Sequence, residues 1–240
     1  AKLGFDWVCI DLQHGMIDYP DLAQMLPAIS TSDATPLVRV PWNEPGVIMK
    51  ALDAGAYGII CPMVNTAADA ARLVSYMRYP PDGQRSFGPT RANFSAGPGY
   101  ASEANDEILC LAMIETAEAM ENLEAIVATP GLDGVYIGPA DLTLGITNGA
   151  LAPGFDREEP RMLEAIHKIM TAAADANIRA CIHCGTPEYA ARALGWGFNM
   201  TTLSNDVRLL ASQANATVAK ARSLMSEEYQ VAAAPQAGGY

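Results

Sequence analysis

The sequence lacks the features of membrane proteins and of nucleic-acid-binding proteins. No apolar run approaches the roughly 20 residues that a membrane-spanning helix needs, and the printed residues contain no basic-then-apolar leader and no lipidation signal. Basic residues are scarce, because 15 Lys and Arg stand against 27 Asp and Glu, which gives a net charge of −12. This charge disfavours nucleic acid and anionic membranes as partners. We therefore expect a cytoplasmic protein that binds neither.

The cysteine and glycine patterns argue against disulfide-bonded proteins and against dinucleotide-binding proteins. The chain has five cysteines, and most of them lie in apolar runs, as reduced core residues do. Cys181-Ile182-His183-Cys184 resembles a metal or redox motif, but on a strand Cys181 and His183 face one side and Cys184 the other. No Gly-x-Gly-x-x-Gly loop follows any predicted strand, so we expect no nucleotide cofactor.

Strand-like apolar runs alternate with helix-like segments along the chain, which predicts an α/β fold with a parallel sheet. The predicted strands are residues 5–11, 36–40, 57–61, 108–114, 132–137, 179–183 and 197–203. The predicted helices are residues 21–29, 44–54, 66–77, 116–128, 158–176, 187–194 and 205–225.

The start of the chain suggests how this sheet closes. Residues 1–4 resemble the glycine-capped end of a helix, so we expect one more strand, and most of its helix, before residue 1. We therefore predict a single (β/α)8 TIM barrel over residues 1–225, followed by a tail over residues 226–240. An open doubly wound sheet is the alternative.

Two regions show no clean periodicity, residues 79–105 and the Gly- and Pro-rich residues 138–156. Loops of this length inside a compact domain are commonly lids or binding loops, or else disordered. The first region carries Arg85 and Arg91. Each could face an anion or an adjacent subunit, or could be a solvated surface charge.

Polar side chains follow five of the seven predicted strands. These residues are Asp11 with His14, Arg39, Glu115, Asp141 and His183. Polar groups are costly to bury unless they are paired or hydrated. Barrel enzymes place their active sites at the carboxyl ends of the strands. The pattern therefore predicts an active site at this edge.

Glu115 and Asp141 follow consecutive strands and should be neighbours. Two carboxylates make a hard oxygen site that suits Mg²⁺ or Mn²⁺, with water and substrate oxygens completing the coordination. An acid/base pair, or a carboxylate paired with Arg39, is the alternative. Gly138, Pro139 and Ala140 form a predicted turn whose backbone N–H groups could bind a substrate carboxylate.

Two side chains near the first two strand ends are candidates for catalysis. Arg39 suits bidentate binding of a carboxylate or an enolate oxygen, although an ion pair with Asp11 or Asp6 would also explain it. His14 is the natural general base, because its ordinary pKa lies near working pH. We expect Asp11 to orient water, a metal or Arg39.

Several ordered motifs between roughly residues 4 and 223 resemble the 4-hydroxy-2-oxo-heptanedioate aldolases, metal-requiring enzymes of the phosphoenolpyruvate/pyruvate barrel superfamily. The motifs are Asp11-x-Gln13-His14-Gly15, Val38-Arg39-Val40-Pro41, Leu52-Asp53-Ala54-Gly55-Ala56, Pro62-Met63-Val64, Arg78-Tyr79-Pro80-Pro81-x-Gly83, Ile114-Glu115-Thr116 and Ile137-Gly138-Pro139-Ala140-Asp141-Leu142.

The resemblance implies roles for individual residues. It places the metal carboxylates on Glu115 and Asp141, the catalytic histidine on His14, and the enolate-binding arginine on Arg39. It also places the acid that supports the histidine on Asp53. Asp53 precedes a strand, however, and should lie at the opposite end of its own barrel, so the histidine should belong to a neighbouring subunit. The resemblance further implies a homo-hexamer or another homo-oligomer, with helix 205–225 exchanged between subunits.

The implied reaction is the reversible cleavage of a 4-hydroxy-2-oxo acid to an aldehyde and pyruvate, or a related 2-oxo acid such as hydroxypyruvate. No Schiff base is expected, because no lysine falls on a predicted strand end; the lysines are Lys2, Lys50, Lys168 and Lys220. The alternatives are cleavage of a malyl or citramalyl thioester, decarboxylation of oxaloacetate, or non-catalytic binding of a metal or an oxo acid.

The chain departs from the family pattern at three positions. Gln13, which we place among the substrate-binding residues, stands where many members carry Glu. Met113 stands where a polar residue is common. His183 stands where a related sequence has an apolar residue that lines the acceptor pocket. His183 therefore suggests a more polar acceptor, such as a hydroxylated aldehyde, unless it is a core histidine.

Overall fold

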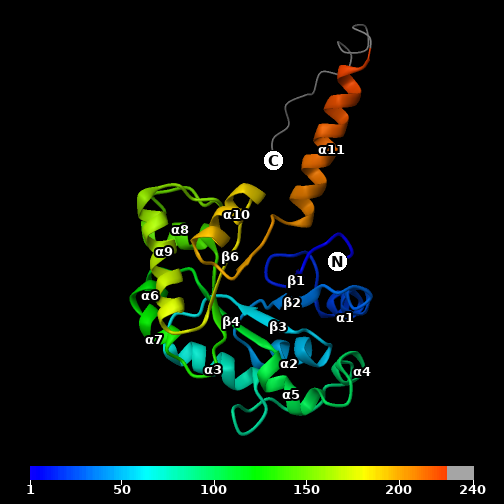
Figure 1. Cartoon of the computed structure of the whole chain (residues 1–240), viewed down its shortest axis with the longest axis vertical. Helices are drawn as coiled ribbons and strands as arrows, with labels where there is room; N and C mark the ends of the chain where they lie inside the picture. The colour runs from blue at the N-terminus through cyan, green and yellow to red at the C-terminus, as the bar shows by residue number, and fades with distance from the viewer. Residues whose placement is uncertain (226–240) are drawn as a thin grey trace.

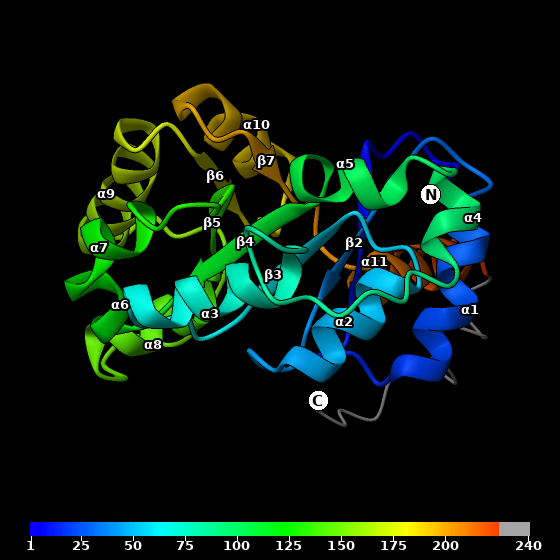
Figure 2. The same cartoon turned by 90° about the horizontal axis from the view of Figure 1, so that it is seen from below.

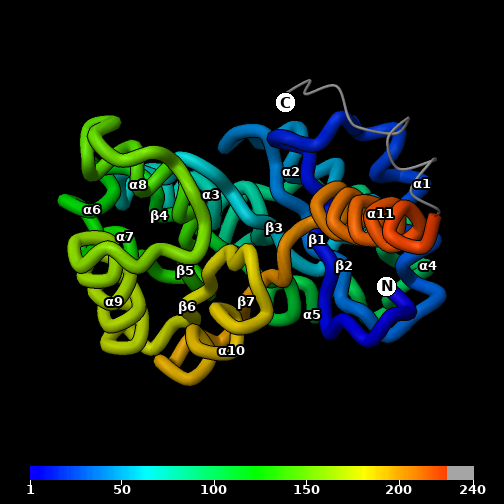
Figure 3. The backbone as a smooth tube through the Cα atoms, turned by 90° about the horizontal axis from the view of Figure 1, so that it is seen from above, coloured from blue at the N-terminus to red at the C-terminus, as the bar shows by residue number. Residues whose placement is uncertain are grey.

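The computed structural model describes residues 1–225 as a parallel sheet with helices on its outer side (Figure 1). The seven strands follow one another in chain order, so β1 and β7 form the two edges, and the sheet curls like part of a TIM barrel (Figure 3). The strands are β1 (Trp7–Asp11), β2 (Thr35–Arg39), β3 (Gly58–Cys61), β4 (Leu109–Ile114), β5 (Gly134–Ile137), β6 (Arg179–Ile182) and β7 (Met200–Thr201).

Helices connect the strands and lie along the outside of the curl, and one last helix follows β7 (Figure 2). They are α1 (Tyr19–Ile29), α2 (Pro45–Asp53), α3 (Ala67–Met77), α4 (Ala92–Ala96), α5 (Tyr100–Glu107), α6 (Ala117–Glu121), α7 (Leu123–Val127), α8 (Pro139–Thr147), α9 (Pro160–Asp175), α10 (Pro187–Trp196) and α11 (Asp206–Ser223). Thr66 caps α3, because its side chain accepts a hydrogen bond from the Asp69 N–H.

Alternation along each strand separates two cores and positions the site. Outward residues pack against the helices in a large apolar cluster, whereas inward residues form a smaller one that includes Leu37, Ile60, Leu111, Met113, Tyr136 and Cys181. Because side chains alternate every second residue, the next inward positions toward the carboxyl ends are Arg39, Glu115, Gly138 and His183. The sheet therefore directs the predicted site residues to one end of the curl.

The structure corrects three expectations of local structure. Residues 79–105 are not a plain loop, because they contain α4 and most of α5, and residues 138–156 contain α8. The helix predicted over residues 116–128 is divided at Asn122 into α6 and α7. The Asn122 side chain donates a hydrogen bond to the Asn65 carbonyl, 2.9 Å away, which ties this break to the loop after β3.

The α/β class and the parallel sheet are confirmed. Helix α11 extends away from the rest of the molecule and has no buried residue (Figure 1). The predicted tail, residues 226–240, lies outside the described residues. Within residues 1–225, no helix is both long enough and apolar enough to cross a membrane.

Candidate active site

Asp11 and Arg39 end neighbouring strands and form a bidentate ion pair. They are partners in the β1–β2 register, with Arg39 Nε 2.8 Å from Asp11 Oδ1 and Nη2 2.5 Å from Oδ2. Partial burial opposes ionisation of Asp11, but the hydrogen bonds and charge of Arg39 outweigh it, so the pKa of Asp11 is lowered. Both groups are therefore charged at neutral pH, and Asp11 orients Arg39.

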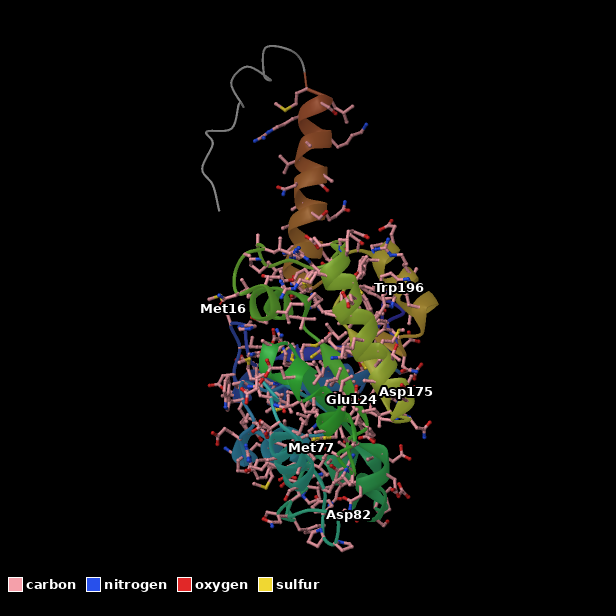
Figure 4. The ribbon with its side chains drawn as sticks, turned by 90° about the vertical axis from the view of Figure 1, so that its left-hand side faces the viewer. Met16, Met77, Asp82, Glu124, Asp175 and Trp196 are labelled. Atoms are coloured by element: carbon pink, nitrogen blue, oxygen red, sulfur yellow. The ribbon has the colours of Figure 1, made fainter. Side chains whose placement is uncertain are left out.

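The turn after β1 carries His14 and Gln13. Asp11 Oδ1 accepts hydrogen bonds from the Gln13 N–H at 3.0 Å and from the His14 N–H at 3.3 Å. A Cβ at Gly15 would lie 2.1 Å from the Asp11 carbonyl oxygen, so only glycine permits this turn. Met16 is fully exposed at 103% and projects outward (Figure 4). The turn therefore presents the exposed His14 at the surface of the molecule.

Glu115 is a buried carboxylate just beyond β4, with only 2% of its surface exposed. Its Oε1 accepts a hydrogen bond from the Met63 N–H at 2.8 Å, and Met63 has a φ of 55°. Burial raises the pKa of Glu115 to about 7; the Asp141 charge adds to this rise, while the Met63 N–H and Arg39 oppose it. The carboxylate is therefore held in place but incompletely compensated.

Gly138 and Asp141 bring the next strand end to Glu115. A Cβ at Gly138 would lie 2.7 Å from Glu115 Oε2, so glycine leaves room for that oxygen. Gly138 caps α8, and Asp141 lies in the first turn of that helix. Pro139 lacks an N–H, so the Ala140 and Asp141 N–H groups are the available donors at the start of this helix. The donors of the predicted anion-binding turn are therefore these two groups.

The donor set of Glu115 and Asp141 fits a hard divalent cation. Asp141 is close enough for its charge to raise the pKa of Glu115. The two carboxylates are therefore better accommodated beside a positive ion. Within residues 1–225, no group of three or more His, Cys, Asp or Glu side chains is arranged to hold a metal. A cation here would therefore depend on oxygens of water and substrate, as the sequence predicts.

His183 lies beyond β6 at the same end of the sheet. Its Nδ1 is 2.7 Å from the Thr202 hydroxyl, and its ring meets the Phe155 ring edge-on at 4.4 Å. Burial, followed by the charges of Arg39 and Arg208, lowers the pKa of His183 to about 4. His183 is therefore neutral at pH 7. Cys181 packs in the inner cluster and Cys184 in the outer one, which confirms that they face opposite sides.

Asp53 lies apart from these residues. It is the last residue of α2 and precedes β3, which places it at the amino end of the sheet. Its Oδ1 accepts a hydrogen bond from Arg85 Nη2 at 2.8 Å, and the Arg85 side chain is fully buried. Arg91 Nη1 donates to the Ala54 carbonyl at 2.9 Å. Both arginines therefore bind within the chain and are not free surface charges.

Three contributors were not predicted as site residues from the sequence. They are the Met63 N–H that holds Glu115, the Thr202 hydroxyl that holds His183, and the Phe155 ring beside it. The sequence contains a signal for two of these contributors. Pro62, which follows β3, stands next to Met63, and the polar pair Thr201-Thr202 lies at the end of β7. Nothing in the local sequence predicts the fold of residues 150–158 that brings Phe155 to His183.

The four lysines lie away from the strand ends, as predicted. Lys2 precedes β1, Lys50 lies in α2, Lys168 in α9 and Lys220 in α11.

Comparison with known proteins gives the same assignment as this geometry. The family model described as HpcH/HpaI aldolase/citrate lyase matches residues 1–213. The chain is 45% identical over 224 residues to a hydroxypyruvate/pyruvate aldolase of Rhizorhabdus wittichii, covering 93% of this chain and 88% of the relative. It is 34% identical over 214 residues to a 2-dehydro-3,6-dideoxy-6-sulfogluconate aldolase of Pseudomonas putida, covering 88% and 82%.

A solved structure agrees with both the sequence relatives and the fold. An HpcH/HpaI aldolase/citrate lyase family protein from Burkholderia cenocepacia superposes with a TM-score of 0.82 at 32% identity, covering 91% of this chain and 86% of that one. The fold, the motifs and the relatives lead to one conclusion: the chain belongs to the HpcH/HpaI aldolase/citrate lyase family.

Proposed function

We propose that the protein is a divalent-metal-dependent aldolase, a carbon–carbon lyase that needs no Schiff base. It reversibly cleaves a 4-hydroxy-2-oxo acid to an aldehyde and pyruvate, or a related 2-oxo acid such as hydroxypyruvate. The observation that carries this proposal is the buried Glu115 beside Asp141, facing the Asp11–Arg39 pair in a chain whose relatives are aldolases.

The residues of the chain divide the work of binding. The Ala140 and Asp141 N–H groups at the start of α8 bind the substrate carboxylate, helped by the positive end of the helix dipole. Gly138 leaves the space that this close approach requires. Glu115 and Asp141 would hold Mg²⁺ or Mn²⁺, which would supply positive charge next to the developing negative oxygen of the substrate.

Arg39 and His14 carry the charge and proton steps. Arg39 uses Nε and Nη2 for Asp11, which leaves Nη1 to bind the enolate oxygen. His14 takes the proton from the 4-hydroxyl as the bond between the third and fourth carbons breaks, and returns it in synthesis. Gln13 and His183 contact the substrate beside these residues. For Gln13 this role is supported by its Oε1 atom, which is buried without a hydrogen-bond partner in the described residues.

We also propose that the working protein is a cytoplasmic homo-oligomer, such as a hexamer, of complete (β/α)8 barrels. An eighth strand between β7 and β1 would close each barrel. Helix α11, with Val207, Leu209 and Leu210 exposed, would pack on a neighbouring copy. The same association would bring Asp53 of one copy to His14 of another. This contact would explain how Asp53 can support the histidine although it lies at the amino end of its own sheet.

The test is pyruvate release from a 4-hydroxy-2-oxo acid by the wild type and by His14→Ala, with Mn²⁺ binding measured separately. We expect the variant to lose at least 100-fold in kcat while it still binds Mn²⁺. Unchanged activity would show that His14 is not the proton carrier. Parallel loss of Mn²⁺ binding would show that it acts on the metal site.

A further inference from the structure

Asn65 holds the loop after β3 against the segment that carries Glu115. Its Oδ1 accepts a hydrogen bond from the Thr116 hydroxyl, and its carbonyl accepts one from the Asn122 side chain at 2.9 Å. Its own N–H donates to Asp69 Oδ2 at 3.2 Å. One residue therefore joins the loop to the residue that follows Glu115, to the break between α6 and α7, and to the first turn of α3.

The loop that Asn65 fixes also carries the donor that holds Glu115. The Met63 N–H, two residues before Asn65, lies 2.8 Å from Glu115 Oε1. Met63 has a φ of 55°, in the left-handed region that favours glycine, so its conformation costs energy and persists only where surrounding contacts enforce it. The hydrogen bonds of Asn65 lie just beyond this strained residue and supply such contacts.

The partner of the Asn65 side chain, Thr116, is itself held in place. Its hydroxyl caps α6 by accepting an N–H of that helix at 3.0 Å while it donates to Asn65. Helix α8 packs closely on the same backbone, since a Cβ at Gly145 would lie 3.0 Å from Thr116 Cα and 3.2 Å from the Glu115 carbonyl oxygen. Asp141 belongs to α8. The bond between Asn65 and Thr116 therefore ties the loop to the backbone that carries both carboxylates.

The two oxygens of Glu115 have different surroundings as a result. Oε1 is bound by the Met63 N–H, whereas Oε2 lies 2.7 Å from the position of a Cβ at Gly138. Gly138 is the N-cap of α8, and the first turn of this helix contains Asp141. With Oε1 held by the loop, Oε2 lies toward the helix that bears the other carboxylate. A shift of the loop would release Oε1 and let the carboxylate rotate.

We propose that Asn65 is a positioning residue for the divalent-metal site, which keeps the Met63 N–H on Glu115 Oε1 and thereby leaves Oε2 for the cation. This inference rests on the proposed function, because it takes Glu115 and Asp141 as the metal carboxylates. Asn65 itself touches neither the metal nor the substrate in this role. Removing a group that orients a metal ligand commonly weakens metal binding by about 10- to 100-fold.

The test measures Mn²⁺ binding by electron paramagnetic resonance, which detects free Mn²⁺ without any catalysis. We expect Asn65→Ala to weaken Mn²⁺ binding about tenfold. In metal-free protein, deuterium uptake by residues 62–66, followed by mass spectrometry, should rise in this variant because the Met63 N–H is no longer held on its acceptor.

Thr116 provides a second test of the same hydrogen bond. Thr116→Val removes the donor to Asn65 and should weaken Mn²⁺ binding about as much as Asn65→Ala, whereas Thr116→Ser keeps the hydroxyl and should bind as the wild type does. The double variant Asn65→Ala/Thr116→Val should bind Mn²⁺ no more weakly than the weaker single variant, because both changes remove one interaction. The two Thr116 variants carry the test if Asn65→Ala does not fold.

Asn105→Ala is the matched control, because the Asn105 side chain also holds a loop but lies in α5, at the amino end of the sheet. Its Oδ1 accepts the Tyr79 N–H at 2.8 Å, and its Nδ2 donates to the Tyr79 carbonyl at 3.0 Å. Asn105→Ala should lower the free energy of unfolding and bind Mn²⁺ as the wild type does. Wild-type Mn²⁺ affinity in Asn65→Ala or in Thr116→Val, or equal weakening in Asn105→Ala, would overturn the role of Asn65.

Failure of the proposed function would appear in the wild type instead. A wild type that binds no Mn²⁺, or that binds it and releases no pyruvate from a 4-hydroxy-2-oxo acid, would contradict the metal-dependent aldolase itself. A wild type that binds Mn²⁺ and is active, beside an Asn65→Ala variant with unchanged affinity, would overturn the positioning role alone.

Discussion

The two ends of the sheet carry arginine–aspartate pairs that differ in what surrounds them. At the amino end, the buried Arg78 donates to the Ile108 carbonyl at 2.6 Å, to the Gly131 carbonyl at 3.2 Å and to Asp133 Oδ2 at 2.6 Å. Asp133 Oδ2 also accepts the Cys110 N–H at 2.7 Å. These bonds tie the pair to backbone groups around it, as in a structural ion pair.

At the carboxyl end, some buried polar groups have no partner among the described residues. Arg39 and Asp11 are paired, but Gln13 Oε1 beside them is buried without a partner in the described residues. Within residues 1–225 Glu115 makes no ion pair with Arg, Lys or His, and burial raises its pKa to about 7. Polar groups left incomplete in a folded protein cost stability, so they indicate a ligand that completes them. The comparison therefore supports a structural role for the Arg78–Asp133 pair and the proposed catalytic role for the carboxyl end.

One amino-end pair does not follow this division. Arg85 reaches Asp53 and the Tyr100 hydroxyl, yet its Nε and Nη1 are buried without hydrogen-bond partners among the described residues. Its guanidinium lies over the Tyr79 ring at 4.5 Å, which compensates part of the charge. Asp53 is also the amino-end residue to which the family resemblance gives a catalytic role. The exception is consistent with a site shared between copies.

The largest expected effect is at the carboxyl end. Glu115→Gln should lower pyruvate release about 1,000-fold, since it removes a charged group from the centre of the site. In metal-free protein the same change should leave the free energy of unfolding equal or higher, because the raised pKa means that burial of the carboxylate costs stability. Steady-state kinetics and urea unfolding measure the two effects.

Glu124→Gln, an exposed change on α7 (Figure 4), is the control for both measurements and should alter neither. Activity within tenfold of the wild type in Glu115→Gln would contradict the assignment of function to this end.

The next effect is at the amino end and concerns stability. Arg78→Leu should lower the free energy of unfolding by about 3 kcal/mol, because it leaves Asp133 without its cationic partner and two carbonyl groups without their donor. Turnover per folded molecule should stay unchanged. Arg72→Leu removes an exposed ion pair with Asp69 on α3 and should cost less than about 1 kcal/mol. A turnover defect in folded Arg78→Leu would contradict the purely structural role of Arg78.

A smaller effect concerns the pH dependence of stability. The unfolded chain binds a proton at His183 near its ordinary value of 6.5, whereas the folded protein does so only at about 4. The stability that neutral His183 contributes is therefore complete above pH 6.5 and is lost as the pH falls toward 4. Between pH 7 and 5 the wild type should lose about 1–2 kcal/mol more than His183→Gln. Parallel stability curves for the two proteins would contradict the buried, neutral state of His183.

The order of elements could be predicted from the sequence because local patterns determine it. Apolar runs ended by Asp11, Arg39 and Glu115 predicted the strands that the structure contains, and the proposed site lies at the ends of those strands. Parallel pairing then follows from the alternation of strands and helices, and the inward direction of each side chain follows from its parity along the strand.

What could not be predicted depends on contacts distant in sequence. Met63 reaches Glu115 across 52 residues, through a backbone conformation that its own neighbours do not impose. The sequence left two roles open for Arg39, and only the β1–β2 register shows that it pairs with Asp11 and not with Asp6. The approach of Phe155 to His183 likewise depends on the Asp156 bonds to Gly185 and Thr186.

The central claim is that Glu115 and Asp141 make the carboxyl end a metal-dependent aldol site. Pyruvate release from a 4-hydroxy-2-oxo acid, measured before and after exhaustive treatment with EDTA, tests it most directly. We expect the treated protein to lose its activity, and Mn²⁺ or Mg²⁺ to restore it in the wild type but not in Glu115→Gln. Full activity in the demetallated protein would contradict the claim.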